Sequence, residues 1–453
     1  MKKLLYLPLF LGGILFAQNL KKDSIQFKKI SDEILVNGKS YEDLRELTKD
    51  IGNRLCGSAN YEKAADWAMK KLVEAGADKV WFEPVMVNVW TRGDESLKLK
   101  IGEGKWEEIQ MLSLGNSEGT KGKDLKGEII LVKTLEDFEK LPDAVVKDKI
   151  IFFNYAFKQD FVVTGKAYGD AGKYRRATPS EVAKKGGKAV IIRSLSSCFD
   201  DVPHTGATRY EDNIAKIPAV AVGTETADRL EKALLNKQKI EAVLNSNCGM
   251  NGQMLTKSVI GEITGKKDQD VIVVSGHLDS WDVGEGAHDD GTGVVQSIEV
   301  LRAFKSLKLQ NNHNIRVICY ANEENGVSGG KTYLQDVKKS KEPHIFALES
   351  DSGGYTPRSF TMGMSSEKVK DLKKWENLFH PYGVYNFEEG HTGTDVEPLR
   401  ELKIPTAELS TDSQRYFDIH HTPEDTFEKV NRRELLLGAT VMTQLIYIID
   451  KNW

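Results

Sequence analysis

Four polar segments in the second half of the chain carry the residue types that bind metal ions. The segments are GHLDSWDVGEGAHDDGTG, YANEENG, LESDSG and IHHTPEDT, and they supply His277, Asp289, Glu323, Glu324, Asp351 and His421. A hydrolytic metal pair needs hard oxygen donors and imidazoles around two ions about 3.5–4 Å apart, with one carboxylate between them. A further carboxylate that binds no metal can act as the base. The pattern therefore predicts hydrolysis at a pair of metal ions.

The six side chains divide into five ligands and one base. We expect His277 and Asp351 to bind one ion. Glu324 and His421 are expected to bind the other, with Asp289 between the two. Three carboxylates offset most of the charge of two divalent cations and leave the site positive, which lowers the pKa of a bridging water toward neutrality. The remaining carboxylate of the set, on the residue before Glu324, is then expected to accept the proton of that water.

Two more aspartates are placed to support these ligands. Asp279 lies two residues past His277 in the same extended segment, so its carboxylate should point to the same face. There it can accept a hydrogen bond from the imidazole N–H that binds no metal, which fixes the tautomer of the ring. We therefore count Asp279, together with Glu323, among the catalytic residues. Asp425 follows His421 and could cap the last helix or support the ligand, and capping is the role that we expect.

Each of these residues taken alone has an ordinary structural explanation. A histidine at a strand end, such as His277, is commonly hydrogen-bonded at the surface, and Asp289 could belong to a turn or cap a helix. Their joint occurrence after successive strands favours the metal site. His288 and His420 each neighbour an expected ligand and are the main rivals in the assignment. We prefer His421 because it directly precedes the TPEDT turn.

The elements that must position these residues follow from the pattern after residue 271. Apolar strands of five or six residues alternate there with helical patterns expected at 293–306, 328–339, 366–380 and 431–449. This alternation predicts an α/β fold with a mostly parallel sheet flanked by helices. Sites in such sheets lie beyond the carboxyl ends of the strands. The expected ligands follow the strands VIVVSG, IRVICYA and HIFALES, and so fall at that edge.

The length of 453 residues calls for two domains, or for one domain with a large insertion. Short β-rich runs such as GEIILV and GGKAVIIRS alternate with helical stretches between residues 113 and 255, and polar segments with glycine flank this part. We predict an inserted α/β module at 113–255. It would separate the N-terminal part of the catalytic domain, residues 19–112, from its C-terminal part, residues 256–453.

The first eighteen residues have the composition of a cleaved secretory signal. Two lysines precede an apolar run and a small residue, and a polar stretch follows. We predict that residues 1–18 direct export, that the mature protein is periplasmic or secreted, and that it has no membrane anchor. The net charge of −4 and the scattered basic residues exclude a nucleic-acid binder. Cys198 and Cys248 could pair in an oxidising compartment, and their separation in sequence leaves this open.

At the metal-binding segments the chain resembles the co-catalytic zinc exopeptidases. The resemblance runs over most of the mature chain and includes the four segments above and the GTD at 393–395. It also covers RLCGSANYEKA, EPVMVNVWTRGDES and, within the predicted insertion, PHTGATRYEDNIAKIPAVAV. These outlying matches point to the branch of the family that hydrolyses dipeptides.

The resemblance implies two zinc ions per chain. It also implies that Asp289 is the bridging ligand, that Glu323 is the general acid and base, and that the chain forms a homodimer. Residues 113–255 would be a protease-associated domain that roofs the cleft and restricts substrates to short peptides. Three alternatives stay open. The first is an aminopeptidase acting on longer peptides at the same metal site. The second is a glutaminyl cyclase, which needs one metal ion, and the third is a binding protein without catalysis, which should lack the ligands or the base.

Overall fold

The computed structural model describes residues 7–453, with side chains from residue 20 onward. Of the predicted signal segment 1–18, the first six residues and all side chains lie outside this description. The backbone from Leu7 onward belongs to α1 (Leu7–Asn37). Within the described residues, no helix combines the length and the apolar character needed to cross a bilayer.

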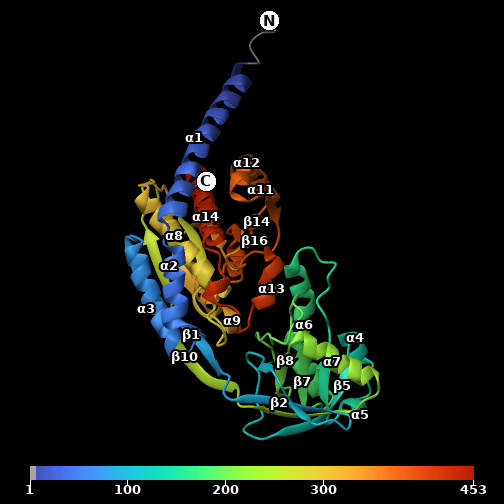
Figure 1. Ribbon diagram of the computed structural model, residues 1–453. Helices are drawn as coiled ribbons and strands as arrows, with labels where there is room; N and C mark the ends of the chain where they lie inside the picture. The colour runs from blue at the N-terminus through green and yellow to red at the C-terminus, as the bar shows by residue number, and fades with distance from the viewer. Residues whose placement is uncertain (1–6) are drawn as a thin grey trace.

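Two sheets, each of eight strands within residues 7–453, organise the chain (Figure 1). The strands of the first sheet are β1 (Lys79–Thr91), β10 (Gly249–Ile263), β11 (Val271–His277), β12 (Asn314–Tyr320), β13 (His344–Glu349), β14 (Pro357–Gly363), β15 (Asn386–Glu389) and β16 (Thr406–Thr411). Their spatial order is β1-β10-β12-β11-β13-β16-β14-β15. The helices that accompany them are α2 (Ser40–Arg45), α3 (Ala59–Glu74), α8 (Thr292–Ser306), α9 (Glu323–Gly326), α10 (Ser328–Ser340), α11 (Ser366–Leu372), α12 (Glu376–Phe379), α13 (Tyr416–Ile419) and α14 (Arg432–Asn452).

The first sheet is mixed, and four of its seven strand pairs are parallel, including β14·β15, so the prediction of a mostly parallel sheet holds for most of its pairs. Its centre is parallel, from β12 through β11 and β13 to β16. The pairs β1·β10, β10·β12 and β14·β16 are antiparallel. Parallel neighbours need a crossover, which α8 and α10 supply between β11, β12 and β13. No helix separates β13 from β14, so β14 runs back antiparallel to β16.

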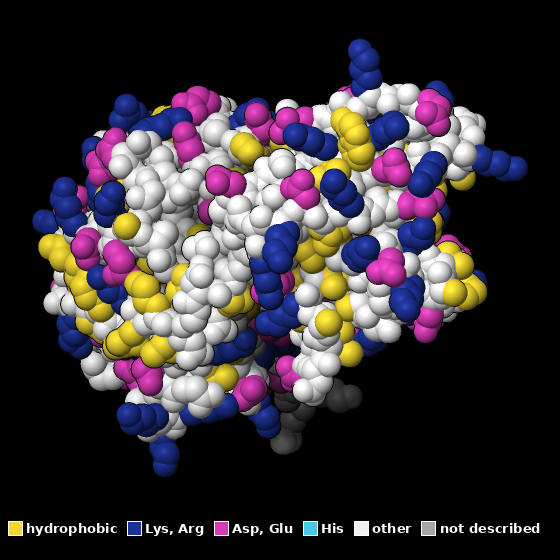
Figure 2. Space-filling view, turned by 90° about the horizontal axis from the view of Figure 1, so that it is seen from below, with side chains coloured by type: hydrophobic (Ala, Val, Ile, Leu, Met, Phe, Trp, Pro, Cys, Tyr) yellow, Lys and Arg dark blue, Asp and Glu magenta, His cyan; other side chains and the backbone are white. Residues whose placement is uncertain are grey.

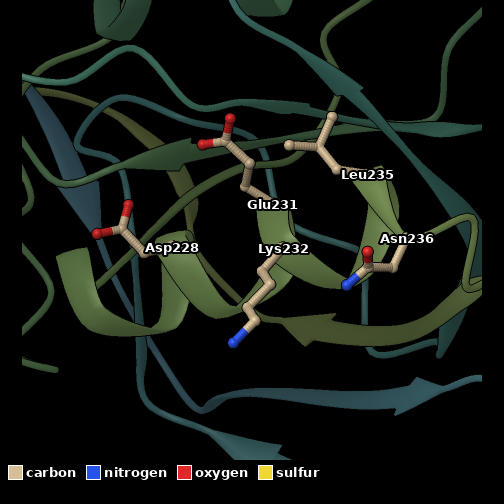
Figure 3. A pocket seen from close by; sticks show the side chains of 5 residues that line it. All are labelled: Asp228, Glu231, Lys232, Leu235 and Asn236. Carbon is tan, nitrogen blue, oxygen red and sulfur yellow. The ribbon is translucent and has the colours of Figure 1, made fainter.

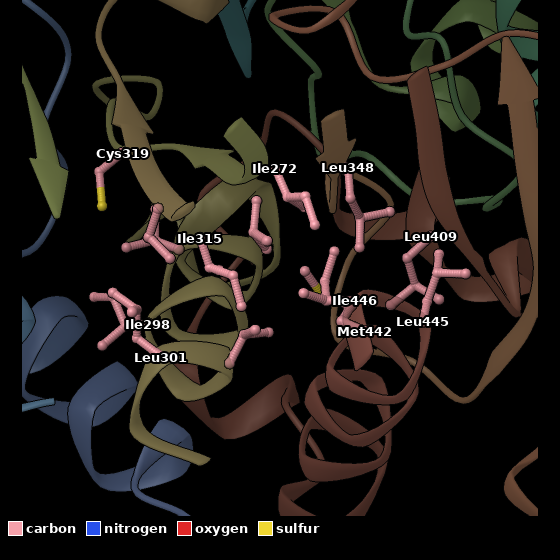
Figure 4. Packing of buried hydrophobic residues seen from close by; sticks show 14 of the residues in the cluster. Ile272, Ile298, Leu301, Ile315, Cys319, Leu348, Leu409, Met442, Leu445 and Ile446 are labelled. Atoms are coloured by element: carbon pink, nitrogen blue, oxygen red, sulfur yellow. The ribbon is translucent and has the colours of Figure 1, made fainter. Parts of the chain in front are cut away.

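Helices cover both faces of the first sheet. Figure 4 shows α8 and α14 packed beneath the central strands, with Ile298 and Leu301 of α8 and Met442 and Leu445 of α14 in the same buried cluster as Ile272. These side chains are almost fully buried, and each contributes about 1.5–3 kcal/mol by leaving water. On the opposite face, α10 packs through its own apolar residues against a second cluster. The predicted helices at 293–306, 328–339 and 431–449 are confirmed, whereas the one at 366–380 is broken into α11 and α12.

The second sheet lies to one side of the first (Figure 1). Its strands are β2 (Glu95–Ile101), β3 (Trp106–Ile109), β4 (Met111–Ser113), β5 (Leu125–Val132), β6 (Ile150–Phe153), β7 (Ala189–Arg193), β8 (Ala219–Val222) and β9 (Ile240–Ser246), in the order β3-β2-β9-β5-β6-β7-β8-β4. Its helices are α4 (Leu135–Glu139), α5 (Asp143–Val146), α6 (Thr164–Lys184) and α7 (Thr224–Leu235).

The strands of the second sheet begin before the predicted insertion and end before it does. β2 pairs with β9, so the sheet takes in residues from Glu95 to Ser246, compared with the predicted 113–255. The difference arises because β1 and β10 form one long antiparallel ladder that extends to Thr91 and Gly249. The chain enters and leaves the second sheet through this ladder, whose end at Gly249 belongs to the polar, glycine-containing sequence that flanks the predicted insertion.

Candidate metal centre

The carboxyl ends of three neighbouring strands bring the expected ligands together. His277 is the last residue of β11, Glu324 lies in α9 directly after β12, and Asp351 lies two residues past β13. β11 lies between the other two strands and is parallel to both, so all three ends meet at one edge of the sheet. Asp289 comes from the loop before α8 and His421 from the loop after α13.

The two carboxylate oxygens of Asp289 face two separate groups of side chains. Its Oδ1 lies 3.2 Å from His277 Nε2, and that nitrogen lies 3.3 Å from an oxygen of Asp351. Its Oδ2 lies 3.1 Å from His421 Nε2, which lies 3.2 Å from an oxygen of Glu324. The expected pairs are therefore both present, and Asp289 lies between them.

Burial and charge in this cluster fit a pair of divalent cations. Asp289 is 5% and Glu324 7% exposed, yet Asp289 Oδ2 and Glu324 Oε1 make no hydrogen bond within the described part of the chain. Buried carboxylates without donors are strongly destabilising unless a cation balances them. Burial and the negative charge of Asp289 raise the pKa of Glu324 well above its usual range. Burial lowers the pKa of His277, but the charge of Asp351 and the contact with Asp289 outweigh it and raise that pKa.

The two rival histidines lie differently. His420 stacks on His421 with ring centres 3.5 Å apart, and its Nε2 lies 3.4 Å from Asp289 Oδ2. Among described residues, His421 is the histidine whose ring lies close to the Glu324 carboxylate. The ring of His288 turns away from the cluster, stacks on Tyr355 and accepts a hydrogen bond from a backbone N–H at 3.1 Å. The geometry favours His421, and the full ligand assignment stays a prediction.

Asp279 supports the site through a different contact from the one predicted. His277 Nδ1 lies 2.9 Å from the backbone carbonyl oxygen of Asp279, whereas the carboxylate is 3.8 Å away. The prediction that this carboxylate receives the imidazole N–H is therefore wrong. The carboxylate instead accepts the backbone N–H groups of Glu323 at 3.0 Å and Glu324 at 3.3 Å. These amides begin a helical turn and have no partner within it, so they attract the carboxylate. The carbonyl still fixes the tautomer of His277.

Asp425 supports the ligand loop and does not cap the last helix. Its carboxylate accepts the backbone N–H of His288 at 2.7 Å and that of Asp289 at 3.1 Å. The cap of α14 is Asn431, whose side-chain oxygen accepts two backbone N–H groups at the start of that helix. Burial is the main cause that raises the pKa of Asp425 to about 7. The predicted capping role is therefore corrected.

Two supporting residues were missed in the sequence. The carboxylate of Asp290 accepts the backbone N–H of His277 at 3.1 Å and that of Gly293 at 2.9 Å, which joins β11 to the start of α8. The Asp-Asp doublet was a signal that could have revealed it. Arg54 is fully buried and donates to backbone carbonyls of the loop after β11, including those of Leu278 at 2.6 Å and Gly286 at 2.8 Å. No local pattern in the sequence indicates this contact, because the loop is more than 220 residues away.

The second sheet contributes side chains next to the metal ligands. α6 lies beside α13 (Figure 1), and Thr164 Oγ1 donates to the backbone carbonyl oxygen of Ser413 at 2.8 Å. Tyr168 of α6 stacks on Phe417, with ring centres 4.7 Å apart. The backbone carbonyl oxygen of Thr205 lies 3.4 Å from Nδ1 of His421. One of the expected ligands therefore has its outer contact in the part of the chain that forms the second sheet.

Other surface features lie away from this cluster. A hollow beside α7 is lined by Asp228, Glu231, Lys232, Leu235 and Asn236 (Figure 3). On the face in Figure 2, basic side chains are interspersed with acidic ones.

Cys198 and Cys248 are both free thiols, so the possible disulfide is not formed in this structure.

Comparison with known proteins gives a consistent result. The sequence model of a protein family, described as peptidase family M28, matches residues 258–446. This range contains all of the expected metal ligands. Carboxypeptidase Q of Xenopus laevis is 31% identical over 438 residues, which are 95% of this chain and 91% of that protein. The chain belongs to peptidase family M28. It is a metallo-exopeptidase, as the resemblance implied.

Solved structures of M28 peptidases share this fold. The peptidase M28 precursor from Shewanella amazonensis is 30% identical and covers 95% of this chain and 97% of its own, with a TM-score of 0.90. A zinc aminopeptidase from Bacillus subtilis is 22% identical and covers 90% of this chain and 94% of its own, with a TM-score of 0.64. The second likeness shows the mixed α/β fold alone.

Proposed function

We propose that this M28 peptidase hydrolyses dipeptides or short peptides at a pair of zinc ions. The observation that carries the proposal is the position of Asp289, whose two oxygens face His277 and His421 at 3.2 and 3.1 Å. Asp351 would complete the first zinc site and Glu324 the second. The set of two imidazoles and three carboxylates suits two zinc ions, and zinc is named for the Bacillus subtilis relative. When bound, the metal pair supplies a water activated at neutral pH and polarises the carbonyl of the scissile bond.

The protein's own contribution to the proton transfers would come from Glu323. Its backbone N–H is held by the Asp279 carboxylate, which positions it at the start of α9 beside Glu324. Burial, together with the charge of Asp351, raises its pKa well above the usual range of a glutamate. Glu323 would take a proton from the attacking water and then deliver it to the amine of the leaving amino acid.

Residues 113–255 would act as a protease-associated domain that roofs the site. Support comes from contacts between this part and the segment that leads to His421. Thr164 bonds to Ser413, and Ser197 Oγ donates to an oxygen of Asp418 at 2.8 Å. A roof held before α13 and within it would leave little room for a long chain, which favours substrates of two or a few residues. We also propose that the chain is exported, that its signal segment is cleaved off after residue 18, and that the mature protein forms a homodimer. N-terminal sequencing of the exported protein and light scattering test these two points.

The experiment that tests the function is hydrolysis of a dipeptide panel by the purified mature protein. N-acetylated and C-amidated versions of each dipeptide are assayed alongside, before and after chelation and zinc replacement. Cleavage restricted to dipeptides with both termini free, lost on chelation and restored by zinc, is the expected result. Loss on N-acetylation with tolerance of C-terminal extension would make the protein an aminopeptidase. If no metal-dependent cleavage is detected, the glutaminyl cyclase and the non-catalytic binding protein become the favoured alternatives.

A further inference from the structure

Glu408 of β16 carries a carboxylate beside the metal cluster that is not paired with a basic side chain. Its Oε1 accepts a hydrogen bond from Ser352 Oγ at 2.5 Å, and Ser352 directly follows the expected ligand Asp351. The groups of described residues that could hold a metal ion do not include Glu408. No lysine or arginine of the described residues lies within ion-pair distance of it. The carboxylate therefore has a neutral hydroxyl as its close partner and lacks a cation.

The second oxygen of Glu408 lies on a side that solvent can reach. The side chain is 14% exposed, and Oε2 lies 3.9 Å from Nδ1 of His391, whose own side chain is 76% exposed. A contact of this length with a well-exposed ring contributes little to stability, because water screens it and the ring loses freedom to hold it. His391 can therefore move aside, and Oε2 is available to a ligand.

The charges around the cluster differ between its two ends. Burial raises the pKa of Asp351, and the nearby charge of Glu408 adds to this effect, so the two carboxylates lie within range of each other. At the other end, a Cβ placed on Gly206 would lie 2.2 Å from Arg175 Nη1 and 2.7 Å from His421 Nδ1. The surroundings are therefore negative beyond Asp351 and positive beyond His421.

This charge distribution orients a bound peptide. A short peptide is positive at its amino end and negative at its carboxyl end, so its amino-terminal residue should lie toward Asp351. The α-amine is attached to the carbon next to the scissile carbonyl, and it therefore stays among the metal ligands. Glu408 lies farther out, beyond Ser352, where the side chain of the same residue can reach. Lysine and arginine place a cation at the end of a long flexible stem, and both cations bind carboxylates.

We propose that Glu408 selects peptide substrates whose amino-terminal residue has a cationic side chain. The inference rests on the proposed peptidase function and names the substrate class that the same site prefers. A lysine or arginine side chain would supply the cation that Glu408 lacks, while the Ser352 hydroxyl holds the carboxylate in place. An acidic side chain in this position would meet a like charge, and this repulsion disfavours its binding.

The test compares lysyl-alanine, alanyl-alanine and glutamyl-alanine as substrates of the zinc-loaded protein. The wild type should give kcat/KM values that fall in this order. Glu408→Gln keeps an oxygen that accepts the Ser352 hydroxyl but removes the charge. It should lower kcat/KM for lysyl-alanine by at least about 10-fold, mainly through KM, and change that for alanyl-alanine by less than about 3-fold. Glu388→Gln removes a charge from an exposed position of β15, and it should leave all three values unchanged.

Two further variants and the metal content keep the experiment decisive. Glu408→Asp keeps the charge on a shorter stem and should retain part of the preference for lysyl-alanine. Glu408→Lys should reverse the order of lysyl-alanine and glutamyl-alanine, and it replaces Glu408→Gln if that variant is unstable. Metal content is measured on the same samples and should match the wild type in each variant.

The possible failures of this test can be told apart. If Glu408→Gln lowers the rates for all three dipeptides equally, or loses metal, then Glu408 only holds Ser352 in place, and the inference is overturned while the peptidase function stands. A ratio of lysyl-alanine to alanyl-alanine that the folded variants leave unchanged has the same meaning. Absence of metal-dependent cleavage of any of the dipeptides by the wild type would overturn both proposals.

Discussion

The carboxylate of Asp425 accepts the backbone N–H of Asp289 at 3.1 Å, and thereby anchors the loop that carries the expected bridging ligand. Replacing it in Asp425→Ala would leave two buried backbone N–H groups without an acceptor. We expect metal affinity to fall by about 10–100-fold, the usual effect of removing an outer contact of a ligand. Competition with a chelator measures this. Glu424→Ala alters an exposed neighbour and should match the wild type.

Glu323→Gln should separate metal binding from catalysis. The amide keeps the size of the side chain but cannot accept the proton of the attacking water. We expect both metal ions to remain, with kcat reduced by at least about 10²-fold. Metal content from mass spectrometry and the steady-state rate are measured on one sample. Near-normal turnover would refute the role of Glu323 as the base.

The neighbouring histidines His420 and His421 can be distinguished by metal stoichiometry. His421 contacts both Asp289 and Glu324, whereas His420 contacts Asp289. His421→Ala is expected to lose one metal ion per chain, and His420→Ala to retain both. Equilibrium dialysis followed by elemental analysis gives the two counts. The reverse result would exchange the two histidines in the assignment.

Gly206→Ala should damage the site without changing any charged group. Gly206 has a φ of +126°, and a Cβ there would come within 2.7 Å of His421 Nδ1 and still closer to Arg175. The clash must displace one of these side chains, so we expect kcat/KM to fall by more than about 10-fold, as small misplacements near a reacting centre do. Gly252→Ala is the matched control, because its φ is also positive, at +88°, but no atom lies within 4 Å of the new Cβ. Equal activity of the two variants would contradict the prediction.

The buried carboxyl group of Glu83 should make the stability of the protein depend on pH, independently of catalysis. It is 6% exposed, its Oε2 makes no hydrogen bond to a described residue, and burial together with Asp336 raises its pKa from 4.5 to about 8. The folded state therefore holds a proton that the unfolded chain releases above pH 4.5, so the free energy of unfolding falls as pH rises toward 8 and then levels.

Glu83→Gln should remove this loss of stability. The variant should resemble the wild type near pH 4.5 and exceed it by about 5 kcal/mol above pH 8, since each unit of pKa shift corresponds to about 1.4 kcal/mol. Denaturant titrations at pH 5, 7 and 9 give the three free energies. Glu108→Gln, at an exposed position of β3, should follow the wild type throughout. A constant difference between Glu83→Gln and the wild type at all three pH values would exclude the proposed titration.

The sequence by itself determined the chemistry and the part of the fold that carries it. Apolar strands followed by His277, Glu324 and Asp351 place these side chains at one sheet edge, because parallel strands end at the same edge. Residue type then indicates divalent metal ions that accept imidazole and carboxylate ligands. The strand and helix order was readable for the same reason, since crossover helices alternate with buried strands. It left the direction of the outer strands open, because pairing depends on partners far along the chain.

Only the tertiary structure decided which groups support the ligands. Asp279 was predicted to bind the His277 ring and Asp425 to cap a helix, but their carboxylates bind backbone N–H groups that become neighbours on folding. Arg54 lies far in sequence from the loop after β11 that it contacts, and no local pattern indicates this contact. Hydrogen bonds depend on distances within about 3 Å and on direction. Sequence spacing specifies such distances within one helix or strand and not between elements, so packing alone fixes these contacts.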